Sequence, residues 1–302
     1  MKVVIEVEDL RKTYGSTVAV DNISFNVAEG EIFGLLGPNG AGKTTAIECL
    51  QGLRIPDSGK LSVLGLDPES EAQALRRRIG SQLQESALPD RIKVWEALDL
   101  FASLAPGRSD WRAIMEQWGL AEKQKSSFSS LSGGQRQRLF VALALVNEPE
   151  VVFLDEMTTG LDPAARRVAW DLIRAIRERG TTVLLVTHFM DEAEQLCDRV
   201  AIVDRGQVIA SDTPQGLIAS YADLIRVKFS TENDDISWLE EIPQVSRVTR
   251  RGRQVEVEGS GPVLALVAAA LASHGITPAD LRAEQPTLED VFLSITGHAA
   301  EE

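Results

Sequence analysis

One eight-residue pattern constrains the fold of this chain more than any other feature. It matches G-x-x-x-x-G-K-[ST] at every defined position, and it lies between a short apolar run, 32–36, and a helical segment that extends from residue 43 to about 53. The pattern consists of Gly37, Pro38, Asn39, Gly40, Ala41, Gly42, Lys43 and Thr44. A buried strand that turns through glycines into a helix is typical of parallel α/β sheets that bind nucleotides.

The chemistry of this loop predicts how it would hold a triphosphate. Glycines let the backbone N–H groups face the phosphates, and the helix that follows adds the positive end of its dipole. We expect Lys43 to reach the β- and γ-phosphates, Thr44 to bind Mg²⁺ through its hydroxyl, and Thr45 to complete the phosphate site. Because kinases, GTPases and motors share such a loop, it predicts nucleotide binding but no single reaction.

Composition limits the class of protein and its partners. The chain has 302 residues, of which 44 % are hydrophobic and 25 % charged, as in soluble globular proteins. Its formal net charge of -14 argues against nucleic acid as a partner, because that binding depends on clustered cations. The charged N-terminal segment does not resemble a signal peptide, and the longest apolar run, 263–272, is too short to span a bilayer. We therefore expect a cytoplasmic protein that reaches any membrane through a partner.

The pattern along the chain predicts two domains. Buried-strand runs at Ile32–Leu36, Val151–Leu154 and Thr182–Val186 alternate with helices, which predicts an α/β sheet, and segment 72–146 is mostly helical. Beyond residue 221, alternating stretches at 225–229, 245–250, 254–258 and 279–283 accompany an apolar helix. We expect an α/β domain over residues 1–220, with a helical subdomain over about 85–150, and a small α+β domain over 221–302, the boundary lying at 219–224.

A second motif narrows the class. Leu131 is followed by Ser132, Gly133, Gly134 and Gln135, and a helix then extends to about residue 147. A serine followed by glycines at a helix start is an ordinary N-cap, and it is also a site for an anion. This pentapeptide resembles the signature of the ABC ATPase superfamily. The resemblance implies an ABC-type P-loop fold and a head-to-tail homodimer, in which the signature of each chain closes over the ATP that its partner holds.

A carboxylate pair follows the next buried strand. The run Val151–Leu154 ends in Asp155 and Glu156. At a strand end such residues can simply be solvated, but after the two motifs above we expect Asp155 to bind Mg²⁺ and Glu156 to polarise the attacking water.

The resemblance implies further site residues. His188 matches the histidine that contacts the γ-phosphate, and Gln84, with Gln82 as a nearby rival, resembles the glutamine that touches Mg²⁺ and the attacking water. Asp162 resembles the key residue of a loop that crosses the dimer interface, and Tyr14 lies where the family stacks an aromatic ring on adenine. One departure is Met157, where most relatives carry proline and where we expect a looser loop.

A motif near the C-terminus indicates the biological role of the ATPase. Segment 286–293 resembles the ending of ATPase subunits of ABC-2 exporters, including the daunorubicin-resistance group. We expect a subunit that powers efflux, bound to the inner face of the cell membrane through a polytopic permease. The alternative is a soluble ABC ATPase of DNA repair or translation, which is disfavoured because the chain has no coiled-coil insertion, tandem unit or basic surplus.

The last helical segment leaves two alternatives open. Leu288, Val291, Phe292 and Ile295 share one helical face. This face could pack within its own domain, or on a partner chain or the ATPase domain and so hold two ATPase units close together.

Overall fold

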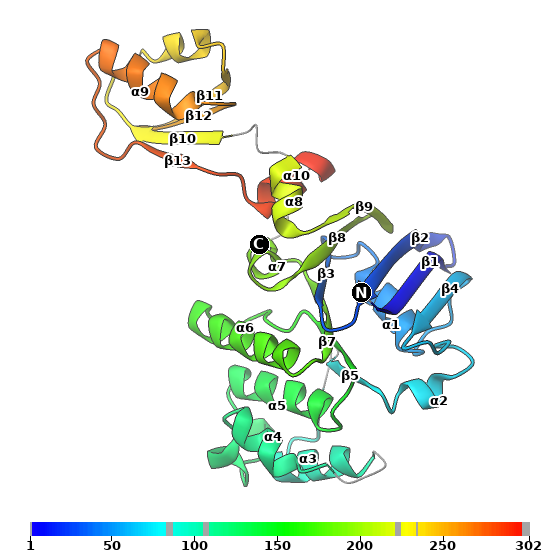
Figure 1. The fold of residues 1–302 in the computed structure, drawn as a ribbon. Helices are drawn as coiled ribbons and strands as arrows, with labels where there is room; N and C mark the ends of the chain where they lie inside the picture. The colour runs from blue at the N-terminus through cyan, green and yellow to red at the C-terminus, as the bar shows by residue number, and fades with distance from the viewer. Residues whose placement is uncertain (1, 83–86, 105–108, 221–224, 234, 298–302) are drawn as a thin grey trace. The chain divides into compact units, whose positions relative to one another are not determined.

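The computed structural model describes residues 2–82, 87–104, 109–220, 225–233 and 235–297. The chain forms two compact units, the first ending at Pro214 and the second beginning at Gln215 (Figure 1). Each unit is described below by itself.

A six-stranded sheet forms the centre of the first unit, in the order β5-β6-β7-β3-β8-β9. The strands β5 (Ile79–Gln82), β6 (Val151–Asp155), β7 (Thr182–Thr187), β3 (Ile32–Leu36) and β8 (Arg199–Asp204) are parallel, and β9 (Gln207–Asp212) is antiparallel to β8. Every residue of β3, β6 and β7 is buried, as their apolar runs predict. The predicted α/β class is confirmed.

A smaller antiparallel sheet shares the core of this unit. Its order is β2-β1-β4, with β1 at Val3–Tyr14, β2 at Thr17–Ala28 and β4 at Ser58–Val63. The helix α1 (Lys43–Leu50) contributes Ile47 and Leu50 to a core that both sheets share, and the rings of Phe25 and Phe33 stack with their centroids 5.3 Å apart. The helix that begins at Lys43 is therefore fixed between two sheets.

Helices make up most of the segment between β5 and β6. The helices α3 (Val94–Ser103), α4 (Trp111–Gln117) and α5 (Gly133–Leu145) contact one another, with short 3₁₀ turns at Ala121–Lys123 and Phe128–Ser130 (Figure 1). The expectation of a mostly helical stretch from 72 to 146 missed β5, which follows the short helix α2 (Ala72–Leu75). β5 has only four residues, including Gly80, so it carries little strand signal.

Two helices cover the strands that follow. α6 (Pro163–Glu178) contacts β7, and α7 (Met190–Leu196) contacts β3, β7 and α6. Asp162 caps α6 by accepting hydrogen bonds from the backbone N–H groups of Ala164 and Ala165, both at 2.9 Å, and Pro163 occupies the first turn.

The second unit begins with α8 (Pro214–Ser220) and contains a four-stranded antiparallel sheet in the order β11-β12-β10-β13. These strands are β10 (Ile225–Ser230), β11 (Val245–Arg251), β12 (Gln254–Gly259) and β13 (Arg282–Glu284), and a 3₁₀ turn lies at Ser237–Glu241. α9 (Val263–Ser273) contributes Val263, Val267 and Leu271 to a core with Val227 and Phe229. The fourth strand is shorter than predicted and begins at Arg282.

The last helix, α10 (Leu288–Thr296), covers its apolar face within the chain. Thr287 and Asp290 form a capping box at its start, and Arg226 forms an ion pair with Asp290 at 2.5 Å. Leu288, Val291 and Phe292 have no exposed surface, and Ile295 is half-buried. A partner chain is therefore not needed to bury this face. Within the described ranges, no helix is long and apolar enough to span a bilayer.

We expect Phe229→Ala to destabilise the second unit strongly. Phe229 is 1 % exposed, and truncating a buried phenylalanine typically costs about 3–5 kcal/mol of unfolding free energy. The control is Leu264→Ala on α9, because Leu264 is 37 % exposed and its loss leaves no cavity. Calorimetry of the full chain should show a transition shifted downwards for Phe229→Ala only. Equal shifts for the two variants would contradict this description of the core.

Candidate functional site

The phosphate-loop pattern lies between β3 and α1, at the carboxyl edge of the central sheet. Gly42 is the N-cap of α1 with φ 99°, and a Cβ there would lie 2.1 Å from the carbonyl oxygen of Ala19. Gly37 has φ 154°, and its Cβ would lie 2.1 Å from the carbonyl oxygen of Val203. Both positions therefore need glycine for backbone reasons, which fixes the curvature that exposes the loop's N–H groups.

Lys43 lies folded over this loop. Its Nζ donates hydrogen bonds to the carbonyl oxygens of Gly37 at 2.7 Å and Pro38 at 2.9 Å, and the residue is 4 % exposed. Burial lowers the pKa of Lys43, and the nearby carboxylates of Glu156 and Asp155 oppose that effect. The ammonium group is thus held at the loop before any phosphate arrives. Asn39 and Gly40 are exposed at the loop's tip, and Ala41 is buried beneath it.

Asp155 and Thr44 form an oxygen pair beside Lys43. The Thr44 hydroxyl donates to Asp155 Oδ2 at 3.3 Å, and Thr45 is half-buried behind it. Asp155 is 2 % exposed, and its Oδ1 has no hydrogen-bond partner among the described residues. Burial, followed by the charge of Glu156, raises the pKa of Asp155 to about 6. A buried oxygen with spare lone pairs fits Mg²⁺, which prefers one or two carboxylates completed by substrate phosphates and water.

In the part of the chain that the structure describes, no group of three or more His, Cys, Asp or Glu residues could hold a metal ion.

Glu156 and His188 meet at the ends of two adjacent strands. Glu156 follows β6, and its backbone N–H donates to the Val186 carbonyl oxygen at 2.9 Å, while His188 follows β7. His188 Nδ1 lies 3.3 Å from Glu156 Oε1, and both side chains are nearly buried. Glu156 has φ 50°, a left-handed conformation that a non-glycine residue seldom adopts. Met157 is 1 % exposed, so its thioether fills buried space in this loop.

The signature residues form a second centre. Ser132 caps α5, its Oγ accepting from Gln135 N at 3.3 Å, and Gln135 Oε1 accepts from Ser132 N at 3.0 Å. A Cβ at Gly133 or Gly134 would meet nothing within 4 Å, so packing within this chain does not require either glycine. These glycines and Ser132 line a cavity of about 460 Å³ with Asp162, and none of the residues 37–44 is among those that line it.

Tyr14 and the two candidate glutamines are the remaining predicted residues. Tyr14 ends β1 and is 40 % exposed, with Arg54 Cζ 5.1 Å and Lys12 Nζ 5.9 Å from the centre of its ring. Gln84 falls outside the described residues, and its rival Gln82 is buried on β5.

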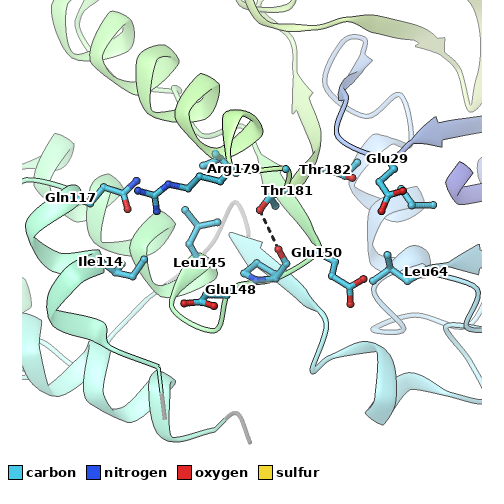
Figure 2. Close-up of a pocket in the computed structure, with 14 residues that line it drawn as sticks. Glu29, Leu64, Ile114, Gln117, Leu145, Glu148, Glu150, Arg179, Thr181 and Thr182 are labelled. Atoms are coloured by element: carbon cyan, nitrogen blue, oxygen red, sulfur yellow. Dashed lines mark hydrogen bonds between the residues drawn. The ribbon is translucent and has the colours of Figure 1, made fainter. Parts of the chain in front are cut away.

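A further cavity lies at the opposite edge of the sheet and is distinct from the candidate site. It has a volume of about 460 Å³ and lies where β6 and β7 begin, as Figure 2 shows. Glu148, Glu150 and Arg179 are among its lining residues, and the Thr181 hydroxyl donates to the Pro149 carbonyl oxygen at 3.3 Å. None of the predicted site residues lines it.

We expect Asp155→Asn to stabilise the chain in the absence of metal and nucleotide at neutral pH. Because the pKa of Asp155 rises from 3.8 to about 6 on folding, the folded chain binds the extra proton between those values. The buried ionised form therefore weakens the fold as pH rises through that window. Asp155→Asn should melt at a higher temperature than the wild type at neutral pH, and the difference should shrink as pH falls towards 3.8.

Asp57→Asn is the control, because its melting temperature should change in the opposite direction. Hydrogen bonds from Lys12 and Thr13 lower the pKa of Asp57 to about 2, so its charge stabilises the fold above pH 3.8 and that gain is lost as pH falls towards 2. Asp57→Asn should lower the melting temperature at neutral pH. A lower melting temperature for Asp155→Asn at neutral pH would contradict the assignment of a buried, destabilising charge.

Comparison with known proteins places these features in a family. The family model described as "ABC transporter" matches residues 20–159. The daunorubicin resistance ATP-binding protein DrrA3 of Streptomyces coeruleorubidus is 38 % identical over 97 % of this chain and 96 % of its own length. The Nod factor export ATP-binding protein I of Paraburkholderia xenovorans is 40 % identical over 97 % of each chain.

Solved structures agree with this placement. An ATP-binding subunit of an ABC transporter superposes with a TM-score of 0.66 at 28 % identity, covering 72 % of this chain and 93 % of that one. A dimeric ATP-binding cassette with bound ADP and Pi gives 0.64 at 25 % identity, covering 69 % and 98 %. The near-complete coverage of the curated relatives, together with the phosphate loop and signature described above, shows that the chain belongs to the ATP-binding proteins of the ABC transporter family.

Proposed function

We propose that this chain hydrolyses Mg-ATP between two copies of itself and powers an exporter through a separate membrane subunit. The observation that carries the proposal is the meeting of Lys43, Asp155, Glu156 and His188 at one edge of the central sheet. Asp155 lies within hydrogen-bond distance of Thr44, and Glu156 within 3.3 Å of His188. The members of the family to which the chain belongs hydrolyse ATP, so this edge is the natural place for the γ-phosphate.

Each residue has a role that its surroundings support. The N–H groups of the loop 37–44 and the Lys43 ammonium neutralise the phosphates, and Thr44 and Asp155 would hold Mg²⁺. When bound, Mg²⁺ neutralises charge on the phosphate oxygens. Glu156 orients the attacking water and accepts its proton. The water oxygen bonds to the γ-phosphorus, the bond to the bridging oxygen of ADP breaks, and phosphate leaves.

His188 supports Glu156 in this reaction. Its Nδ1 lies next to the Glu156 carboxylate, so His188 fixes the direction of that group while its other ring nitrogen can face the γ-phosphate. Tyr14, with Arg54 and Lys12 near its ring, would stack on adenine.

The signature loop supports hydrolysis between two chains. Ser132, Gly133 and Gly134 line a cavity that contains no residue of the phosphate loop, and the glycines leave room that this chain does not fill. An open helix start with bare N–H groups suits an anion brought by another molecule. We infer that Ser132, Gly133, Gly134 and Gln135 contact the partner's ATP, and that Asp162 lies at the same interface. A dimeric cassette is among the solved structures similar to this chain.

The export role rests on the relatives. Two of them are named for daunorubicin resistance and Nod factor export and align over nearly the whole chain. We infer a polytopic permease partner, which would place the chain on the inner face of the cell membrane, and no nucleic-acid partner. These two relatives therefore support the exporter over the alternative of a soluble repair or translation ATPase. Because the relatives are named for different cargoes, we assign cargo selection to the permease.

We expect Glu156→Gln to bind ATP normally. Its turnover rate should fall by about 10²- to 10⁴-fold, the usual effect of removing a general base. With hydrolysis blocked, the ATP-bound dimer should accumulate and appear as a larger species on size-exclusion chromatography. Glu122→Gln is a suitable control, because Glu122 is exposed in the helical part of the first unit. Wild-type turnover by Glu156→Gln would remove Glu156 from the mechanism.

Mixing two defective chains tests the shared site. Lys43→Ala should lose the phosphate contact of its own loop, and Ser132→Arg should block the partner's nucleotide. A heterodimer of the two retains one intact composite site and, if the sites work independently, should have about half of the wild-type activity. Because random pairing makes about half of the dimers heterodimers, a 1:1 mixture should recover about a quarter of the wild-type activity. Each variant alone should be inactive. Full activity of Ser132→Arg alone would contradict the composite site.

A further inference from the structure

A buried carboxyl group lies behind the catalytic edge, on a helix to which the motifs assign no role. Glu192 belongs to α7 and has no exposed surface. A glutamate is seldom buried so completely unless its carboxyl group is paired or hydrogen-bonded. The groups around it therefore indicate what it does.

One side chain from another helix pairs with this carboxyl group. Trp170 of α6 donates its indole N–H to Glu192 Oε1 at 3.0 Å. Glu192 Oε2 and the buried Thr158 hydroxyl have no hydrogen-bond partner among the described residues. Burial is the largest influence on the pKa of Glu192 and raises it. The contact with Trp170 therefore joins α7 to α6.

The start of α7 connects this junction to the catalytic pair. α7 begins at Met190, two residues beyond His188. The Phe189 backbone N–H donates to the Thr187 hydroxyl at 3.0 Å, which holds the turn on both sides of His188. The position of His188, 3.3 Å from Glu156, therefore depends on how α7 is held.

The helix α6 holds this region at several further points. Arg166 forms an ion pair with Asp191 at 3.5 Å, and its guanidinium lies 4.2 Å from the centre of the Phe189 ring. One turn beyond Trp170, Arg174 donates to the Gln195 carbonyl oxygen at 3.3 Å. These residues are four apart, so they form one stripe along α6 that contacts the segment 189–195. Within this stripe, Trp170 contacts a fully buried side chain, that of Glu192.

We propose that Glu192 is a positioning residue for ATP hydrolysis, holding on α6, through Trp170, the segment that follows His188. The inference rests on the proposed function, because it concerns the same reaction. Glu192 touches neither the nucleotide nor the water. It keeps the carboxylate and the imidazole at the separation that directs the attacking water.

A positioning role predicts a specific kinetic signature. Glu192→Ala removes the acceptor for Trp170 and frees the segment that follows His188, so kcat should fall by about 10-fold to 100-fold, as expected when reacting groups move by a fraction of an ångström to an ångström. The KM for Mg-ATP and the affinity for a fluorescent ATP analogue should change less than about twofold, because the phosphate loop is untouched. Glu192→Gln retains an acceptor for Trp170 and should restore at least half of the wild-type kcat.

The matched control is a buried glutamate at the other edge of the same sheet. Glu31 is 7 % exposed, accepts a hydrogen bond from Ala28 N at 2.7 Å and pairs with Arg199 at 3.3 Å. Glu31→Ala should lower the melting temperature without lowering kcat. It therefore separates general loss of stability from misplacement of catalytic groups.

Trp170→Phe keeps the test decisive if Glu192→Ala does not fold. It removes the N–H donor while keeping an aromatic ring, and kcat should fall several-fold with unchanged nucleotide affinity. Wild-type kcat in Glu192→Ala, or in Trp170→Phe where the alanine variant does not fold, would overturn the inference. A loss in Glu192→Gln as large as in Glu192→Ala would also overturn it. Absence of ATP hydrolysis by the wild type would instead overturn the proposed function itself.

Discussion

The parallel pairing of β3, β7 and β6 is the constraint on which the site depends. In this register Leu36 lies opposite Thr187, and Val186 lies opposite Asp155. The residues that follow each strand are therefore neighbours at one edge of the sheet: the phosphate loop after β3, His188 after β7 and Glu156 after β6. A shift of one residue in either pairing would reverse the faces of a completely buried strand, so the core fixes the site geometry.

The same burial makes the site electrostatically demanding. Lys43, Asp155 and Glu156 lie together where water is largely excluded, so desolvation lowers the pKa of Lys43 and raises that of Asp155. Lys43 uses the loop's own carbonyl groups as acceptors, and Asp155 keeps one oxygen without a hydrogen-bond partner among the described residues. The negative charge of a triphosphate would pair with Lys43, and a divalent cation would pair with Asp155. Binding would therefore offset the free-energy cost of burying these charged groups. The second unit has a separate core, to which we assign no chemistry.

The residues that meet at this edge of the sheet could be proposed from the sequence because their motifs are local. Each pairs a buried apolar strand or a helix start with the residues next to it, so Gly42, Glu156 and Ser132 could be placed from their neighbours in the chain alone. Longer-range features could not be found in this way. Trp170 and Glu192 are 22 residues apart, and nothing in the sequence indicates their hydrogen bond. The strand β5 has only four residues and therefore gives little sequence signal. Periodicity showed that α10 has an apolar face, but it could not decide whether that face is covered within the chain, as it is.

The most direct test of the central claim is to locate the backbone that surrounds the γ-phosphate during turnover. Vanadate trapped with ADP and Mg²⁺ takes the place of that phosphate, and ultraviolet light then cleaves the peptide chain next to it. Mass spectrometry of the products identifies the cleaved positions. We predict cuts both in the phosphate loop, Gly37–Thr44, and in the signature, Ser132–Gln135, because in the proposed dimer two chains enclose each nucleotide. Cleavage confined to Gly37–Thr44 would contradict an ATP site shared between two chains.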